Sequence, residues 1–152
     1  MRKSIIVLAL FFLFCNIVAQ NPDKPDPEKQ AIIQVIQASY VDGLQNEGDT
    51  VKINQGFHPG FEMLIAEKDG NLKKFSISEW KTKIRKDIAS GKLPRKPGEQ
   101  ISVKFLQVDV TGNAAVAKFE FYAGDKLTFV DYQFLYKFDP GWKIVSKIFY
   151  RF

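Results

Sequence analysis

The sequence predicts an α+β domain in which N-terminal helices pack on one face of a strongly curved antiparallel sheet. Apolar residues recur at helical spacing early in the domain, whereas residues 100–152 are rich in β-branched and aromatic residues and are divided by short turns. Short turns between long strands indicate an antiparallel meander. Helices first and strands later, in a chain of 152 residues, favour one domain that contains both layers.

The N-terminus has the layout of a secretory signal peptide at residues 1–19. Arg2 and Lys3 supply a basic start, an apolar run covers residues 5–14, and Ala19 is a small residue at the expected cleavage position. A permanent membrane anchor is the competing interpretation, but the apolar run is shorter than the roughly 20 residues that span a bilayer. We expect an exported protein, periplasmic or extracellular, with no stable membrane anchor after cleavage.

The only cysteine lies inside this predicted signal peptide. Cys15 follows an apolar run, as in bacterial lipoproteins, but lipoprotein processing prefers a small residue where Phe14 stands. After cleavage the protein would have no disulfide, no thiolate nucleophile and no cysteine metal ligand.

A polar linker and a long helix are expected next. Residues 20–26 are polar and contain two prolines, so the folded domain is expected at residues 27–152. Asp26 is a candidate N-cap, and a proline follows it at the first helical position. The helix should end near Gly48, and residues 49–56 could form a short second helical segment. The apolar residues at helical spacing are Ile32, Val35, Ile36, Tyr40 and Leu44.

The middle of the chain predicts a hairpin and then a further helix. Ser76 and Glu79 have the spacing of a capping box, and Gly91 can end the helix that follows it. The apolar face of this helix contains Ile77, Trp80, Ile84 and Ile88. The segments before it are a break at residues 57–60, a strand at 61–66, a tight turn at 69–71 and a short partner strand at 72–75.

Four long strands complete the chain. In the third and fourth of them, both faces carry apolar side chains. An antiparallel sheet that covers one core should be polar on its other face, so this surplus predicts a cavity, a dimer interface, or both. The strands are expected at residues 101–110, 114–122, 126–138 and 142–152.

The order of these elements resembles the nuclear-transport-factor-2-like (NTF2-like) cone, a superfamily that includes SnoaL-like polyketide cyclases, ketosteroid isomerase and scytalone dehydratase. The resemblance covers nearly all of the chain after the signal peptide. It implies a conical cavity between the concave face of the sheet and the helices, and commonly a homodimer formed through the other face. The stretches that look like its putative lumazine-binding branch, common among exported bacterial proteins, are Phe-His-Pro at 57–59, Val-Asp-Tyr at 130–132, the run 139–145, and Lys147.

The expected lining of that cavity is apolar and mostly aromatic, which favours a small apolar or aromatic ligand. Aromatic residues at these spacings also build cores, so each candidate could instead be a core residue. The candidate ligand-binding residues are Tyr40, Met63, Trp80, Phe119 and Phe121.

Two residues are candidates for catalysis. His58 is the only histidine and ordinarily titrates near neutrality, so it could be a general base; alternatively, its imidazole is bound to backbone and fixes the Phe-His-Pro turn. Asp131 lies among apolar residues and, if buried, must be paired, hydrogen-bonded or protonated. The resemblance to ketosteroid isomerase implies that Asp131 would stabilise an enolate oxygen together with Tyr40 or Tyr132. The alternative is a structural ion pair, for which Lys147 is a candidate.

Charge and motif content argue against several classes of protein. Loss of Arg2 and Lys3 with the signal peptide would lower the formal charge from +5 to +3, and the basic residues of 73–96 are spread along a solvated face, so nucleic-acid binding is not expected. No metal site is expected, because a site built on the single histidine would need several carboxylates around it, and the spacing of the sequence does not supply them. The sequence contains neither a glycine-rich phosphate loop nor a Gly-x-Ser-x-Gly motif, so no cofactor is expected.

Two functions remain. The aromatic surplus without a catalytic set favours a secreted, non-enzymatic binding module of unknown ligand. The alternative is a cofactor-independent isomerase, dehydratase or cyclase that uses His58 or Asp131 in the pocket. A packed core without a cavity would instead leave a structural or protein-interaction domain.

Overall fold

The computed structural model describes residues 26–152. The predicted signal peptide, residues 1–19, and the predicted linker as far as residue 25 lie outside the described residues. None of the helices in residues 26–152 has the length and apolar composition that crossing a bilayer requires.

The domain begins with one continuous helix over residues 27–47, here called the rod, which is an α-helix in its first part and a π-helix in its second. α1 (Pro27–Val35) starts where predicted, because the Asp26 carboxylate accepts a 2.9 Å hydrogen bond from the Glu28 N–H. It continues into η1 (Ile36–Glu47), which has the wider hydrogen-bond spacing of a π-helix. Gly48 ends the rod with a φ of 76°, a conformation that favours glycine.

The predicted short second helix forms and packs against the rod. α2 (Thr50–Gly56) is capped by Asp49, whose carboxylate accepts hydrogen bonds from two N–H groups of the first turn. Gly56 allows the close approach of α2 to η1, because a Cβ at this position would lie 2.1 Å from the Ser39 hydroxyl oxygen. A side chain at residue 56 would therefore push the two helices apart.

α3 (Ile77–Ala89) has the predicted start. The Ser76 hydroxyl accepts a hydrogen bond from the Glu79 N–H, and the Glu79 carboxylate accepts one from the Ser76 N–H. Ile88, predicted on the buried face, is instead 44% exposed. It lies in the last turn of α3, where it contacts Gly48 at the end of the rod.

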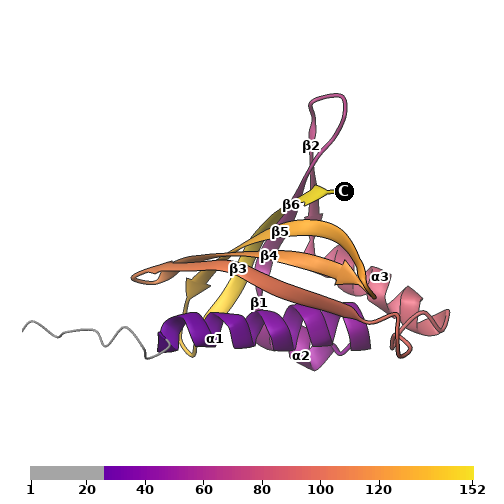
Figure 1. Ribbon diagram of the computed structural model, residues 1–152, viewed down its shortest axis with the longest axis horizontal. Coiled ribbons are helices and arrows are strands. Elements are labelled where there is room, and N and C mark those ends of the chain that lie inside the picture. Colours follow the sequence, from indigo (N-terminus) through magenta and orange to yellow (C-terminus); the bar gives the residue numbers. More distant parts are fainter. Residues whose placement is uncertain (1–25) are drawn as a thin grey trace, which may run out of the picture.

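Six strands form one curved sheet that does not close into a barrel (Figure 1). The order across the sheet is β2-β1-β6-β5-β4-β3, and β3 to β6 form the predicted antiparallel meander. One pairing was not predicted: β1 runs parallel to β6, so the sheet is mixed. The strands are β1 (Phe57–Ala66), β2 (Leu72–Ser76), β3 (Ile101–Thr111), β4 (Ala114–Ala123), β5 (Lys126–Lys137) and β6 (Trp142–Arg151).

The predicted break at residues 57–60 is part of β1. Phe57 pairs with Ile144 of β6, and pairing resumes only at Glu62, which lies opposite Ser146. The extra residues of β1 between these two pairs form an irregularity that accommodates Pro59, which has no N–H to donate. The Phe-His-Pro-Gly stretch therefore marks a bulge inside β1, and the strand begins at Phe57 instead of at the predicted residue 61.

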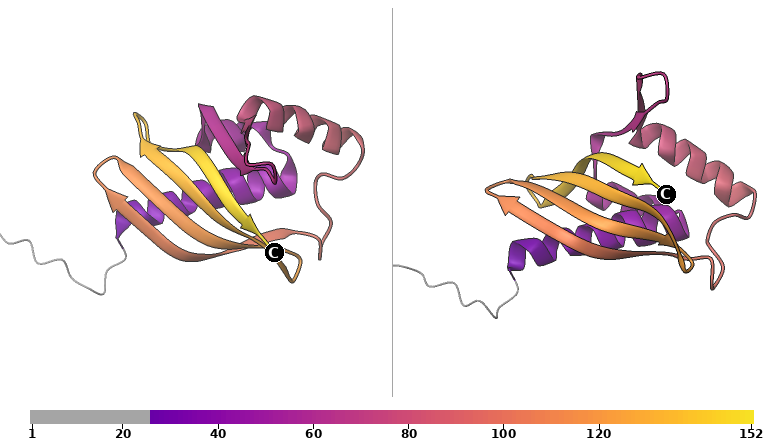
Figure 2. Two further views of the ribbon diagram at one scale, coloured as in Figure 1. Left: turned by 90° about the horizontal axis from the view of Figure 1, so that it is seen from above. Right: turned by 45° about the horizontal axis from the view of Figure 1, so that its top comes forward.

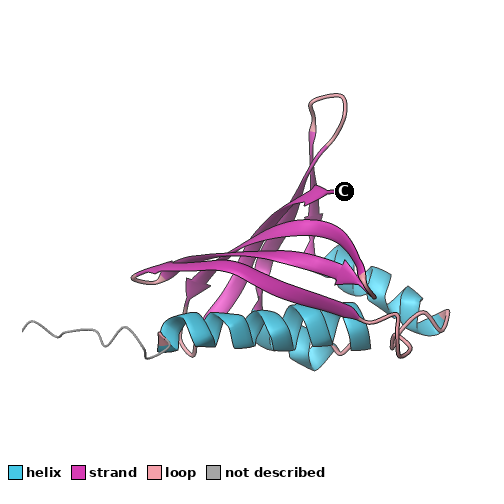
Figure 3. Ribbon diagram, viewed as in Figure 1, coloured by secondary structure: helices cyan, strands magenta, loops and turns pink. Residues whose placement is uncertain are grey.

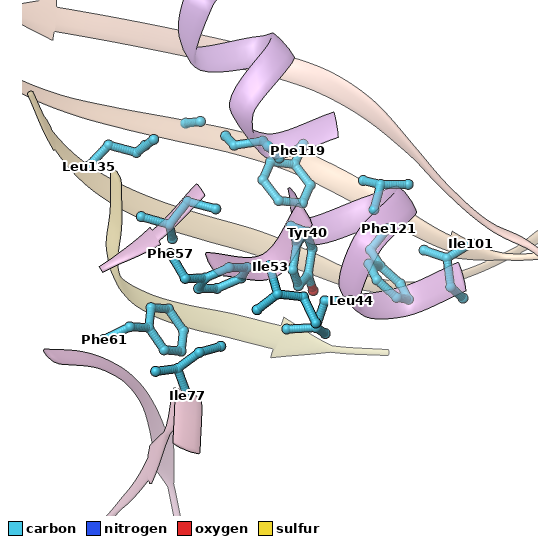
Figure 4. Packing of buried hydrophobic residues seen from close by; sticks show 14 of the residues in the cluster. Tyr40, Leu44, Ile53, Phe57, Phe61, Ile77, Ile101, Phe119, Phe121 and Leu135 are labelled. Carbon is cyan, nitrogen blue, oxygen red and sulfur yellow. The ribbon is translucent and has the colours of Figure 1, made fainter. Parts of the chain in front are cut away.

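All the helices of the described chain lie on one side of the sheet, and its other face is uncovered (Figures 2 and 3). The core fills the space between the two layers and contains the fully buried Tyr40, Ile53 and Phe119. Figure 4 shows Tyr40 between the sheet residues Phe119 and Phe121. The α+β fold class predicted from the sequence is confirmed, with three helical segments packed on a six-stranded sheet.

Candidate functional site

A pocket of about 490 Å³ opens between η1, α3 and the part of the sheet where β1, β2 and the end of β6 meet. Its walls are mainly apolar, and aromatic rings reach it from both layers of the fold. The rings are those of Tyr40 from η1, Trp80 from α3, Phe75 from β2, Phe121 from β4, Phe129 from β5 and Phe149 from β6.

The register of the strands sets these side chains next to one another. Met63 of β1 lies opposite Phe75 of β2 and opposite Lys147 of β6. Phe129 of β5 lies opposite Phe121 of β4, and their rings meet edge to face with centroids 5.4 Å apart. The parallel β1–β6 pairing thus joins the β1–β2 hairpin, which forms one wall of the pocket, to β6, which carries Lys147 at the pocket floor.

Tyr40, Asp131 and Lys147 form a buried hydrogen-bonded triad at the pocket floor. Asp131 Oδ2 accepts a hydrogen bond of 2.7 Å from the Tyr40 hydroxyl and forms an ion pair with Lys147 Nζ at 2.8 Å. Lys147 Nζ also donates to the Tyr40 hydroxyl oxygen at 2.7 Å. Tyr40 and Lys147 line the pocket, whereas Asp131 is fully buried behind them. The structural pairing of Asp131 with Lys147 is therefore present, and Tyr40 completes it.

Tyr40 and Lys147, the two members of the triad that line the pocket, have pKa values that are shifted in opposite directions. Burial raises the pKa of Tyr40 well above its ordinary value, and the negative charge and hydrogen bond of Asp131 raise it further. Burial lowers the pKa of Lys147, while the neighbouring Asp131 carboxylate opposes that shift. At neutral pH the Tyr40 hydroxyl is therefore a stable hydrogen-bond donor and not a phenolate.

Aromatic rings surround the Lys147 ammonium. Its Nζ lies 4.9 Å from the ring centroid of Tyr40, 5.2 Å from that of Phe149, and 5.8–5.9 Å from those of Trp80, Phe121 and Phe129. Such contacts stabilise a cation at a ring face. The pocket therefore already holds a positive charge of its own, set among rings and neutralised by a carboxylate.

Three buried side-chain atoms of Asp131 and Gln133 lack hydrogen-bond partners in the described part of the chain. Asp131 Oδ1 has no hydrogen-bond partner, and neither does either polar atom of the Gln133 side chain. Both residues are on the concave face of β5 and fully buried, and Gln133 lies opposite Lys147 in the register of β5 and β6. Unsatisfied buried groups of this kind destabilise a fold.

The mouth of the pocket is basic. Lys73 of β2, Lys83 of α3 and Arg151 of β6 line it and are exposed, and the pocket lining contains no aspartate or glutamate. The prediction that the basic residues of 73–96 are simply a solvated face is thus incomplete, since Lys73 and Lys83 also border the cavity. In the described chain, no group of three or more histidine, cysteine, aspartate or glutamate side chains lies close enough to hold a metal ion.

Four of the five residues predicted to line the cavity do so: Tyr40, Met63, Trp80 and Phe121. Phe119 does not line it. Although it shares a strand face with Phe121, its ring is enclosed between Tyr40 of η1, at 6.0 Å, and Phe105 of β3, at 5.4 Å. The position along the strand, and not the face, decides which of the two aromatic rings meets the cavity.

His58 lies outside the pocket. Its ring stacks on Phe138 with centroids 4.9 Å apart, and its Nδ1 accepts a hydrogen bond of 3.0 Å from the Gly60 N–H. This arrangement matches the alternative interpretation of the sequence, in which the His58 imidazole is bound to backbone at the Phe-His-Pro turn. The two catalytic candidates, His58 and Asp131, are not brought together.

Sequence reasoning did not identify Phe129, Phe149 and Arg151 as lining residues. A signal was present for two of them, because Lys147, Phe149 and Arg151 alternate along one face of the last strand. The sequence did not indicate which strand lies beside β6, because β1 is remote in the chain and runs parallel to it.

The chain is similar to known proteins both in sequence and in fold. Residues 27–150 match the family described as putative lumazine-binding. No curated protein matches the chain. The solved structure of an NTF2-like protein of unknown function from Shewanella baltica OS155 is 21% identical in sequence, with a TM-score of 0.63, and the match covers 83% of this chain and 94% of that chain.

Two further NTF2-like proteins of unknown function have similar structures. The protein from Silicibacter pomeroyi DSS-3 is 18% identical, with a TM-score of 0.62 and coverage of 81% of this chain and 94% of that chain. The protein from Methylobacillus flagellatus KT is 20% identical, with a TM-score of 0.58 and coverage of 86% and 96%, respectively. At these identities the likeness concerns the fold alone, and it confirms the NTF2-like cone.

Proposed function

Because the chain belongs to the putative lumazine-binding family, we propose that it is a secreted, non-enzymatic protein that binds a small apolar or aromatic molecule in the pocket between η1, α3 and the sheet. Membership of this family indicates ligand binding of unknown specificity, so the family's name does not identify the ligand. The proposed export, to the periplasm or beyond the cell, rests on the signal-peptide layout of residues 1–19.

The observation that carries the proposal is the pocket itself. A volume of about 490 Å³ is within the range of small-molecule sites, and its ring-lined walls with a few polar groups are the usual composition of such sites. Lys147 has three N–H donors; within the triad it donates to the Tyr40 hydroxyl and is ion-paired with Asp131, which leaves donor capacity for an acceptor atom of a ligand. The pocket therefore offers both apolar area and a point of orientation.

The geometry favours binding over catalysis. A carboxylate that abstracts a proton must reach the substrate, but Asp131 lies behind Tyr40 and Lys147, and its Oδ2 already accepts a hydrogen bond from Tyr40 and is ion-paired with Lys147. His58 is bound to the Gly60 N–H outside the pocket. The triad at the floor is the one observation that favours the alternative, a cofactor-independent isomerase, dehydratase or cyclase in which Tyr40 would stabilise an oxyanion.

A homodimer is part of the proposal. The uncovered face of the sheet carries large apolar side chains that are 41–63% exposed, a surface that monomeric proteins seldom leave open. Pairing of a second copy through this face would cover them and leave the concave face and its pocket free. The residues are Phe134, Tyr136, Ile148 and Tyr150.

The test compares two tryptophan substitutions at neighbouring positions of β1. Met63→Trp adds bulk inside the pocket, whereas Leu64→Trp adds it on the opposite face of the same strand. We expect prodan, a neutral naphthalene dye, to bind the unmodified protein and the Leu64→Trp variant with equal affinity and to lose at least tenfold in affinity for the Met63→Trp variant. Equal binding to all three proteins would contradict the proposed site.

A further inference from the structure

We infer that the ligand is an amphipathic anion, whose ring system lies among the aromatic side chains and whose carboxylate, sulfonate or phosphate is held at the pocket mouth by Lys73 and Arg151. This inference rests on the proposed function and specifies the chemistry of its ligand. It depends on three observations: the sign of the charges at the pocket, the partners that those charges have, and the cation that already occupies the ring cluster.

The charges at the pocket are of one sign. Four cationic side chains line it, namely Lys73, Lys83, Lys147 and Arg151, and no carboxylate does. Charges of one sign around an apolar cleft attract a ligand of the opposite sign and raise its local concentration.

Two of the four cations are already neutralised. Lys147 is paired with Asp131 at 2.8 Å, and Lys83 is paired with Asp87 one turn further along α3. Neither Lys73 nor Arg151 forms an ion pair within residues 26–152. These two side chains therefore provide the positive charge that is available to a ligand.

Lys73 has no ion-pair partner in the described chain although charged side chains lie close to it. Lys74, on the other face of β2, pairs with Glu62 at 3.1 Å. Hydrogen bonds from Ser76 lower the pKa of Glu79, and the positive charge of Lys73 adds to this effect. However, the Glu79 carboxylate is committed to the cap of α3, because it accepts hydrogen bonds from the N–H and the hydroxyl of Ser76.

Arg151 is placed to hold an anion directly above the rings. Its guanidinium carbon lies 5.2 Å from the ring centroid of Phe129 and 5.9 Å from that of Phe149, and both rings line the pocket. Contact with two rings restrains the long side chain, and the planar guanidinium can bind a carboxylate through two parallel hydrogen bonds. A group bound there would have its apolar part against the same rings.

A cationic ligand is the obvious competitor, because clusters of rings also bind cations. In this pocket that role is taken by the chain itself, since the Lys147 ammonium lies within 5.9 Å of five ring centroids. A second cation would find these rings already occupied and would meet repulsion from the unpaired Lys73 and Arg151 at the mouth. An anion with an apolar body is therefore the ligand that both the floor and the mouth of the pocket accommodate.

The test compares 2-naphthoate with 2-naphthamide, which has nearly the same shape and no charge. We expect isothermal titration calorimetry at low ionic strength to give about tenfold or tighter binding of the naphthoate, the size of one net charge-assisted hydrogen bond. The preference should shrink as salt is added, because the mouth is exposed to solvent. It should disappear in Lys73→Gln/Arg151→Gln and persist in the matched control Lys74→Gln/Lys29→Gln, which removes two cations that do not line the pocket.

The outcomes separate this inference from the proposed function. Equal binding of the acid and the amide, or tighter binding of the amide, would overturn the anionic ligand class and leave a neutral-ligand pocket. A preference that survives in Lys73→Gln/Arg151→Gln would overturn the assignment to these two side chains. Failure of both naphthalene compounds and of prodan to bind would overturn the proposed function as well.

Discussion

Lys147 Nζ and Asp131 Oδ2 lie 2.8 Å apart on neighbouring strands, the aspartate fully buried and the lysine almost so. The Tyr40 hydroxyl bridges them by donating to Asp131 and accepting from Lys147. Transfer of two charges into a protein interior is unfavourable, and their attraction offsets that cost only when the geometry is good. The pair therefore connects β5 and β6 to η1 at the pocket floor.

Removal of one partner should be more harmful than removal of both charges. We expect Lys147→Met to lower the free energy of unfolding by about 3–5 kcal/mol, because the Asp131 carboxylate would be left buried without its cation. In Asp131→Asn/Lys147→Met the loss should be clearly smaller, since no charge remains buried. Urea denaturation followed by circular dichroism measures both variants. A double variant as unstable as the single one would show that the pair is not coupled.

Tyr40 should make the fold sensitive to alkali. Its pKa is raised in the folded protein, so above the ordinary tyrosine pKa near 10 the native state holds a proton that the unfolded state has lost, and stability falls as pH rises. In a spectrophotometric titration, one of the five tyrosines should ionise only when the protein unfolds. Tyr40→Phe should remove that late step. If all five ionised together in the folded protein, the buried triad would be wrong.

Gln133 should be replaceable by an apolar residue of similar length. Its amide is buried without a hydrogen-bond partner, so Gln133→Met removes unsatisfied polar atoms while filling the same space. We expect an unchanged or higher free energy of unfolding, by up to about 1 kcal/mol, from urea denaturation. A loss of more than about 1 kcal/mol would mean that the amide has a partner, such as a buried water, that the substitution breaks.

His58 should matter for stability and not for ligand binding. We expect His58→Ala to cost about 1 kcal/mol, because it removes the stacking on Phe138 and the hydrogen bond from the Gly60 N–H. Its affinity for 2-naphthoate, measured by calorimetry, should equal that of the unmodified protein. A large loss of affinity with unchanged stability would return His58 to the list of site residues.

The uncovered face of the sheet should hold the proposed homodimer together. We expect Tyr150→Lys to shift the protein towards monomer in size-exclusion chromatography with light scattering, since it places a charge among apolar side chains. Val51→Lys provides the control, because Val51 is equally exposed, at 63%, but lies on α2. A parallel shift in both variants, or a monomer without any substitution at high micromolar concentration, would count against this interface.

Local signals predicted most of the fold. The N-cap at Asp26 and the capping box at Ser76 each depend on a few neighbouring residues, and the helix that follows each of them begins where predicted. A short helical segment was expected at residues 49–56, but its N-cap at Asp49 was not predicted. The four strands of the meander are likewise bounded by glycine-containing turns, and they end within one or two residues of the predicted positions. These features depend on short-range chemistry, which a single sequence contains.

Long-range pairing was harder to predict. The parallel alignment of β1 with β6 joins segments separated by most of the domain, and nothing near Phe57 or Trp142 specifies it. That pairing brings Met63 and the hairpin residue Phe75 to the row of side chains that includes Lys147. The candidate lining residues could be predicted from their apolar and mostly aromatic character. The basic mouth could not be predicted, because it depends on the register of β2, β1 and β6.

The central claim is that the pocket holds a ligand, and native mass spectrometry tests it most directly. The protein would be purified from its own host, and its native mass compared with its denatured mass, with Met63→Trp treated in parallel. The account predicts an added mass on the native protein, a ring-containing anion once released, and no added mass on the variant. A clean native mass that stays clean when 2-naphthoate or prodan is supplied would contradict it.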